Sequence, residues 1–140
     1  MVRGFLKVNE ELDTKLPERQ TKSSAGYDFY VIEDVEIPPH GMVMLPTNVK
    51  AYMQEDEVLM LYARSSLAIK RGLILQNTTG IIDADFYPLE IKVALKNTTA
   101  QPVKLLKNER CAQGIFLKYL VSDNGNLDNT REGGFGSTKK

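Results

Sequence analysis

The C-terminal segment "REGGFGSTKK", Arg131–Lys140, has the composition of a phosphate-binding loop. Three glycines surround one aromatic ring, beside two hydroxyls and three cationic side chains. Glycine lets a backbone approach a ligand closely, and hydroxyls and cations are groups that bind phosphate. The segment predicts a nucleotide contact, with Arg131 at the phosphates and Phe135 at the base. A solvated terminus explains the same composition more simply, so the rest of the chain has to decide.

Four further segments place polar residues beside the ends of apolar runs. In "SAGYD", Asp28 stands at the mouth of a strand, and "ARSSLAIKRG" puts Arg64 at a helix start, where free N–H groups favour an anion. The other two segments are "NTTGIIDADFY" and "NERCAQGIF". The last contains Arg110 and Gln113 at the start of a strand.

Each of these segments also has an ordinary structural explanation. Asp83 and Asp85 follow a glycine, where aspartates are commonly solvated turn residues. Gln113 inside an apolar strand is typical of a hydrogen-bonded structural residue. His40 follows two prolines in a loop, and Cys111 lies in an apolar run, as a small core residue would.

The elements that must position these segments are short strands. Eight apolar runs of strand length are separated by turn residues: "GFLKV", "YDFYVI", "MVMLP", "EVLMLYA", "LILQN", "EIKVALK", "VKLLK" and "GIFLKYLV". In "EIKVALK", Ile91, Val93 and Leu95 alternate with polar residues, which indicates a half-buried strand. Many short strands in one domain predict a sandwich, jelly roll or barrel.

One short helix is expected in "SSLAIKRG", capped by Ser65 or Ser66 and closed by Gly72. We expect a β body over residues 1–121. Residues 122–140 would form a polar linker and a flexible glycine-rich arm of the same single domain.

Composition restricts the function further. The 140 residues contain 18 Lys+Arg and 18 Asp+Glu, and the zero formal charge argues against a nucleic-acid or anionic-membrane binder. A single cysteine permits no internal disulfide. No run approaches the roughly 20 apolar residues of a membrane span. We therefore expect a soluble, cytoplasmic protein with no nucleic-acid or membrane partner.

Taken together and in order, the five segments resemble the motifs of the trimeric deoxyuridine triphosphatase (dUTPase) family. The five matching stretches, in chain order, are "AGYD", "RSSLA", "NTTGIIDAD", "ERCAQ" and "REGGFGST". The resemblance extends from about Ser23 to Thr138, nearly the whole chain. It implies an all-β, jelly-roll-like barrel or sandwich.

The resemblance also implies a role for each matching residue. Asp83 would activate the attacking water, and Asp28 would hold the water shell of a Mg²⁺ ion. The phosphate-binding residues would be Arg64, Ser65, Ser66, Gln113, Arg131, Ser137 and Thr138. The uracil and deoxyribose contacts would be Asn77, Gly80, Ile82, Asp83, Phe86, Tyr87 and Phe135.

Three positions depart from the family pattern. The third motif continues with Phe86 and Tyr87 where Tyr-x-Gly is usual, so either ring would pack under the deoxyribose, with Phe86 favoured by spacing. Ala63 replaces a frequent glycine, and the chain closes with two lysines. None of these departures removes a catalytic group.

The implied activity is hydrolysis of dUTP to dUMP and pyrophosphate, by Mg²⁺-assisted in-line attack of water on the α-phosphorus. This reaction would keep uracil out of DNA and supply dUMP for thymidylate synthesis. The family further implies a homotrimer with shared active sites, in which the tail of one subunit closes over a nucleotide held by the others.

Three alternatives are weighed against this activity. A related deoxycytidine triphosphate deaminase needs a glutamate where Ala94 stands here. A P-loop NTPase needs GxxxxGK[ST], which is absent from the chain. A regulatory module that retains the nucleotide pocket differs in class, and a regulatory protein partner stays open alongside catalysis.

Overall fold

The structure is a computed structural model that describes residues 1–124. The predicted tail contacts of Arg131, Phe135, Ser137 and Thr138 lie outside the described residues. None of the helices in residues 1–124 is long and apolar enough to cross a membrane.

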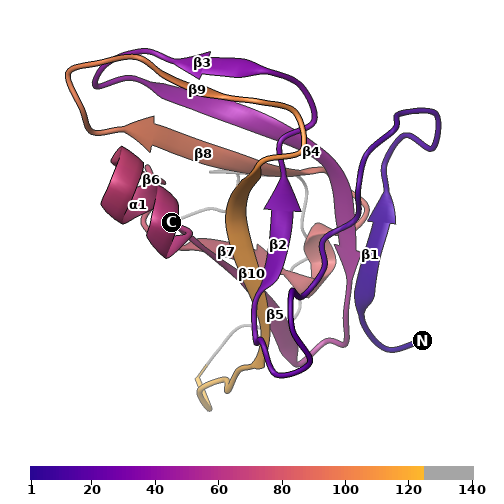
Figure 1. Ribbon diagram of the computed structural model, residues 1–140. Helices are drawn as coiled ribbons and strands as arrows, with labels where there is room; N and C mark the ends of the chain where they lie inside the picture. The colour runs from indigo at the N-terminus through magenta and orange to yellow at the C-terminus, as the bar shows by residue number, and fades with distance from the viewer. Residues whose placement is uncertain (125–140) are drawn as a thin grey trace.

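Two four-stranded antiparallel sheets form the body (Figure 1). The first sheet has the order β1-β4-β8-β6, made of Gly4–Lys7, Met42–Tyr52, Ile91–Asn97 and Leu73–Leu75. The second has the order β2-β10-β5-β7, made of Tyr27–Tyr30, Arg110–Lys118, Glu57–Tyr62 and Gly80–Asp83. A ribbon of β3 (Val35–Ile37) and β9 (Val103–Leu105) lies across one end. The all-β, jelly-roll-like prediction is confirmed.

The core lies between the sheets and follows the predicted alternation. On β8, Ile91, Val93 and Leu95 are fully buried, whereas Lys92 between them is exposed. The second sheet contributes Phe29, Leu59 and Ile82 to the same cluster. The alternate side chains of β8 are exposed or half-buried, so the outer face of this strand is left for polar contacts.

The helix α1 (Ser65–Arg71) forms where it was predicted, but its cap differs. Gly72 closes the helix in the left-handed region, with φ 68°, as expected. The prediction that Ser65 or Ser66 caps the start was wrong, because Arg64 is the capping position and no side chain bonds there. Both serine hydroxyls are therefore left unused by the cap.

Two strands were not predicted, β3 and β7. The strand β7 lies inside "NTTGIIDADFY" and leads into the 3₁₀ turn η1 (Ala84–Phe86). The strand β4 also extends well beyond "MVMLP", through a register shift between Pro46 and Val49, where Asn48 has a φ of 59°. An irregularity of this kind interrupts the apolar pattern on which the sequence prediction depends.

Candidate active site

The first, second and fourth segments meet in one hollow beside β2 and β10. We call this hollow of about 400 Å³ the phosphate hollow. It brings together Asp28, Arg64, Ser65 and Gln113, which are four of the predicted site residues. The remaining lining residues are Gln20, Ser24, Ala25, Gly26, Arg110 and Ile115.

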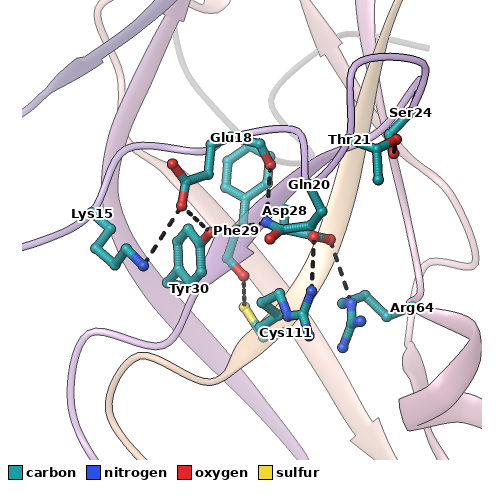
Figure 2. Close-up of polar contacts among 11 residues, drawn as sticks. Lys15, Glu18, Gln20, Thr21, Ser24, Asp28, Phe29, Tyr30, Arg64 and Cys111 are labelled. Atoms are coloured by element: carbon teal, nitrogen blue, oxygen red, sulfur yellow. Dashed lines mark hydrogen bonds and ion pairs between the residues drawn. The ribbon is translucent and has the colours of Figure 1, made fainter.

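The carboxylate of Asp28 lies between two arginines in this hollow (Figure 2). Arg64 Nε is 3.4 Å from Oδ1, and Arg110 Nη1 is 3.6 Å from Oδ2. Asp28 is only 8% exposed, so the two guanidinium groups compensate a largely desolvated charge. Two cations sharing one carboxylate leave a formal positive excess, which attracts an anion.

Arg110 was not among the predicted site residues. Its position three residues before Gln113 in "NERCAQGIF" was the available signal. The sequence could not show that a residue at the start of β10 would face Asp28 across the sheet, because that depends on the pairing of β10 with β2.

The side chain of Gln113 joins the three segments. Its residue pairs with Asp28 on β2 and with Tyr62 on β5. Its Nε2 donates to the Ala63 carbonyl over 3.2 Å. Gly26 leaves space for its Oε1, which a Cβ at that position would strike. The amide is thus held by structure, and its oxygen remains at the edge of the hollow.

A loop before β2 supports Asp28 and supplies one wall of the hollow. The Asp28 amide donates to the Glu18 carbonyl over 2.9 Å. The Tyr30 hydroxyl donates to Glu18 Oε1 over 2.8 Å, and Gln20 Nε2 donates to the same hydroxyl over 3.2 Å (Figure 2). The Tyr30 hydroxyl lowers the pKa of Glu18, with help from nearby Lys15. Burial raises the pKa of Tyr30, and Glu18 raises it further.

The third segment forms a tight turn and a strand elsewhere on the same sheet. The Thr79 amide donates to the Asn77 carbonyl over 2.7 Å, and Thr78 has a φ of 61°. A Cβ at Gly80 would lie 3.0 Å from Leu61 Cβ, so glycine permits close packing on β5. The Ile82 side chain is 1% exposed in the core, which leaves only its backbone for a ligand.

The two candidate rings have different surroundings. Phe86, on η1, is 6% exposed and packs in the core cluster. Tyr87 is 39% exposed, and Lys50 Nζ lies 5.4 Å from the centre of its ring. A ligand therefore meets at most an edge of Phe86, whereas the Tyr87 ring is open.

Asp83 and the phosphate hollow lie on one face of the second sheet but at opposite ends. Gln113 pairs with Tyr62, while Leu117, four residues further along β10, pairs with Val58. Val58 in turn pairs with Asp83 on β7. Four residues of strand span about 13 Å, and β7 is two strands away, about 10 Å across. One chain therefore does not bring Asp83 to the phosphate hollow.

Cys111 lies on β10 beside β2 and does not line the phosphate hollow. Its thiol is buried and donates to the Phe29 carbonyl over 3.5 Å. Burial raises the pKa of the thiol to about 12, so it stays protonated at neutral pH. The prediction that Cys111 is a core residue is confirmed.

A cationic hollow that also holds a carboxylate is suited to a phosphate-bearing ligand such as a nucleotide. The family model for dUTPase matches residues 13–139. The chain belongs to the dUTPase family.

Relatives agree with this assignment along most of the chain. A deoxyuridine 5'-triphosphate nucleotidohydrolase of Lactococcus lactis is 40% identical, with 98% of this chain and 97% of the relative aligned. The corresponding enzyme of Wolinella succinogenes is 35% identical over 89% of this chain and 87% of the relative.

Solved structures show the same fold. The crystal structure of dUTPase from Streptococcus mutans matches with a TM-score of 0.79 and 43% identity, over 86% of this chain and 99% of that one. The dUTPase of Staphylococcus bacteriophage 80alpha matches with a TM-score of 0.77 over 94% of this chain and 99% of that one. At 21% identity, the phage enzyme supports the fold alone.

Proposed function

We propose that the protein hydrolyses dUTP between its α- and β-phosphates, releasing dUMP and pyrophosphate by in-line attack of water. The observation that carries this proposal is the phosphate hollow, where Asp28 holds Arg64 and Arg110 beside Ser65 and Gln113. In a cell this reaction would keep uracil out of DNA and supply dUMP for thymidylate synthesis.

The hollow suits a triphosphate because its charge is already arranged. Arg64 and Arg110 offer N–H donors that match phosphate oxygens. Ser65 is an exposed hydroxyl on the first turn of α1, and it is free of any capping bond. Donors that are held in place before the substrate arrives stabilise developing charge without reorganisation. Ser66 lines an adjoining hollow rather than this one.

Asp83 is proposed to orient the attacking water. An aspartate with an ordinary pKa near 4 is a weak base, yet it can align a water and accept its proton as the bond to phosphorus forms. Its position at the end of β7 sets the carboxylate on a rigid strand rather than a loop.

The turn before β7 is proposed to recognise the uracil. Its backbone groups near Asn77 and Gly80 can present donors and acceptors in a fixed order, which distinguishes uracil from cytosine. Ile82 would contribute through its backbone. One of the two rings, Phe86 or Tyr87, would exclude a ribose 2′-hydroxyl by bulk.

Mg²⁺ is proposed as the cofactor. Within residues 1–124 there is no group of three or more histidine, cysteine, aspartate or glutamate residues that could hold a metal. This fits Mg²⁺, which commonly keeps several waters and binds through one carboxylate together with substrate phosphates. Asp28 is the carboxylate that faces the phosphate hollow and would hold the ion through water. Bound there, Mg²⁺ would neutralise phosphate charge.

A homotrimer with shared sites is proposed as the active form. The face between Asp83 and the phosphate hollow carries apolar residues, Ile115, Met60 and Ile81, in one cross-strand row. Ile81 is 63% exposed in the single chain. A second copy packed on this face would cover the row and could bring its Asp83 to the hollow of the first. The residues proposed to close the site from the tail are Arg131, Phe135, Ser137 and Thr138.

Pyrophosphate release from dUTP, dCTP, dTTP and UTP, measured in parallel, tests the proposed function. We expect turnover of dUTP to exceed that of the other three nucleotides by orders of magnitude and to require Mg²⁺. Equal turnover of dUTP and dCTP, or release of ammonia from dCTP, would overturn the proposal.

A further inference from the structure

A second hollow adjoins the phosphate hollow, on the other side of Arg64 and Arg110. This second hollow, of about 460 Å³, lies between α1 and the start of β10. Its lining residues are Arg64, Ser66, Leu67, Lys70, Arg71, Asn108, Glu109 and Arg110. None of the residue roles assigned above uses Lys70, Arg71 or Asn108.

The second hollow is strongly cationic. Four of its lining residues are arginine or lysine, and Glu109 is the one carboxylate among them. Glu109 is already paired with Arg71, whose Nη1 lies 3.3 Å from Oε1. Arg71 also donates through Nη2 to the Lys104 carbonyl over 2.6 Å, which fixes this wall. Lys70 is exposed and has no ion pair within the part of the chain that the structure describes.

The lining indicates a small, dense anion rather than a second nucleotide. It contains no aromatic ring among the described residues, so nothing there would stack on a base. It does offer the Ser66 hydroxyl and the Asn108 amide beside the cations, which are donors that suit phosphoryl oxygens.

The shared arginines connect this hollow to the reaction. Arg64 and Arg110 line both hollows, and both are paired with Asp28 at separations of 3.4 and 3.6 Å. Each guanidinium carries five N–H donors in a fixed plane, so it can face Asp28 and still offer donors to an anion on either side. A polyanion that leaves the phosphate hollow therefore finds the same two side chains on the far wall.

We propose that the second hollow binds inorganic pyrophosphate, the product that would be released in the adjoining phosphate hollow. The inference rests on the proposed function for the origin of its ligand, but not for the chemistry of binding. Its consequence is that pyrophosphate and a nucleotide can occupy the same subunit at once, so pyrophosphate inhibition is not purely competitive with dUTP.

The test is calorimetric titration of pyrophosphate into the full-length protein at a fixed concentration of free Mg²⁺. The titration is carried out with and without saturating α,β-imido-dUTP, whose own binding is measured first. We expect pyrophosphate to bind in both cases. Lys70→Gln should weaken pyrophosphate binding about tenfold, the loss expected for one charged hydrogen bond.

Lys107→Gln is the matched control. It removes the same charge one residue away from Asn108, at an exposed position outside the hollow. It should leave pyrophosphate affinity unchanged, and neither variant should alter kcat or KM for dUTP measured without pyrophosphate. Inorganic phosphate should bind more weakly than pyrophosphate at the same site.

Two results would overturn the proposal. One is loss of the pyrophosphate signal when the analogue is bound, which means one shared site. The other is an equal loss of pyrophosphate affinity in Lys70→Gln and Lys107→Gln. That result would mean that pyrophosphate responds to the general positive charge of the surface and not to a defined site. If instead the analogue itself fails to bind while pyrophosphate binding still depends on Lys70, the proposed function fails and the anion site stands.

Discussion

At the scale of single residues, Asp28 and Asp83 are two carboxylates on one sheet with different surroundings. Asp28 is nearly buried and faces two arginines, so its charge is committed to the phosphate hollow. Asp83 is half-buried at the end of β7. Its position along the sheet is about four residues from Gln113, which lines the phosphate hollow. These surroundings support the proposed roles, in which Asp28 holds charge and Asp83 orients the attacking water.

Asp83→Asn should lower kcat for dUTP by about 10²–10⁴-fold with little change in KM, because the amide cannot accept the proton of the attacking water. Steady-state pyrophosphate release measures both constants. Asp85→Asn, two residues along the same turn, is the control and should retain most of the activity. If Asp85→Asn is the inactive variant, the role belongs to Asp85.

The roles of Phe86 and Tyr87 can be distinguished by measuring the selectivity for dUTP over UTP. If Phe86 excludes the 2′-hydroxyl, Phe86→Leu should raise kcat/KM for UTP relative to dUTP by about tenfold, because the smaller side chain admits the extra oxygen. Because Phe86 is a core residue, the thermal unfolding midpoint of the Phe86→Leu variant is measured together with its activity. Tyr87→Ala removes an exposed ring and should fold normally. A change in selectivity with Tyr87→Ala alone reverses the assignment.

At the scale of secondary-structure elements, the sequence pattern correctly predicted those elements that depend mainly on nearby residues. The run "EIKVALK" became β8 with its alternation intact, and "SSLAIKRG" became α1 closed by Gly72. The serine cap failed because Arg64, not a serine, occupies the capping position. The strands β3 and β7 were missed because each is short and is stabilised by its partner strand rather than by its own pattern.

The candidate site was likewise only partly predictable from the sequence. Its residue types and order could be recognised in the sequence, but their distribution between two ends of a sheet could not, because it depends on the register of β10, β5 and β7. For that reason Arg110 was named in the fourth segment but was assigned no role in the site. The burial of Ile82 and Phe86 likewise follows from which face of β7 and η1 meets the core.

The N-terminal segment provides a test of how the elements are joined. Arg3, just before β1, donates through Nε to Glu57 Oε2 over 2.9 Å, and Glu57 opens β5 in the other sheet. Glu57 is 3% exposed, and its hydrogen bonds from Arg3 and the Gln54 amide hold its pKa below the ordinary value. A lowered folded-state pKa contributes stability above the unfolded value of 4.5, and this is lost as pH falls through the folded value.

Arg3→Gln should therefore lower the urea midpoint at pH 7, and the difference from the unmodified protein should shrink as pH falls below about 4.5. Equilibrium unfolding at pH 7, 5 and 3.5 measures it. Lys22→Gln is the matched control, because it removes one exposed positive charge that takes no part in the contacts of Glu57 and should change the urea midpoint little at any pH. A pH-independent effect of Arg3→Gln would mean that packing of the arginine stem, not the Glu57 charge, is what matters.

At the scale of the whole molecule, the sheet register separates Asp83 from the phosphate hollow within one chain, which supports the proposal of sites shared between subunits. The row of Ile115, Met60 and Ile81 runs across the strands from the edge of the phosphate hollow to β7, and the 63% exposure of Ile81 is unfavourable for a lone subunit. Association of identical chains around a three-fold axis would cover this face in every subunit by the same contact. Assembly and catalysis would then depend on one surface.

Mixing two inactive parents tests this arrangement directly. Asp28→Asn damages the phosphate hollow and Asp83→Asn damages the opposite end of the face, so each homotrimer should be inactive. If every site takes its hollow from one subunit and its Asp83 from another, random equimolar exchange should leave about a quarter of the sites with both halves intact. We expect pyrophosphate release to recover toward that fraction after denaturation and joint refolding, with native mass spectrometry to confirm mixed trimers. Mixing either parent with itself is the control and should stay inactive. Verified mixed trimers without activity would show that both aspartates act within one chain, and a protein that remains monomeric at all concentrations would remove the shared site altogether.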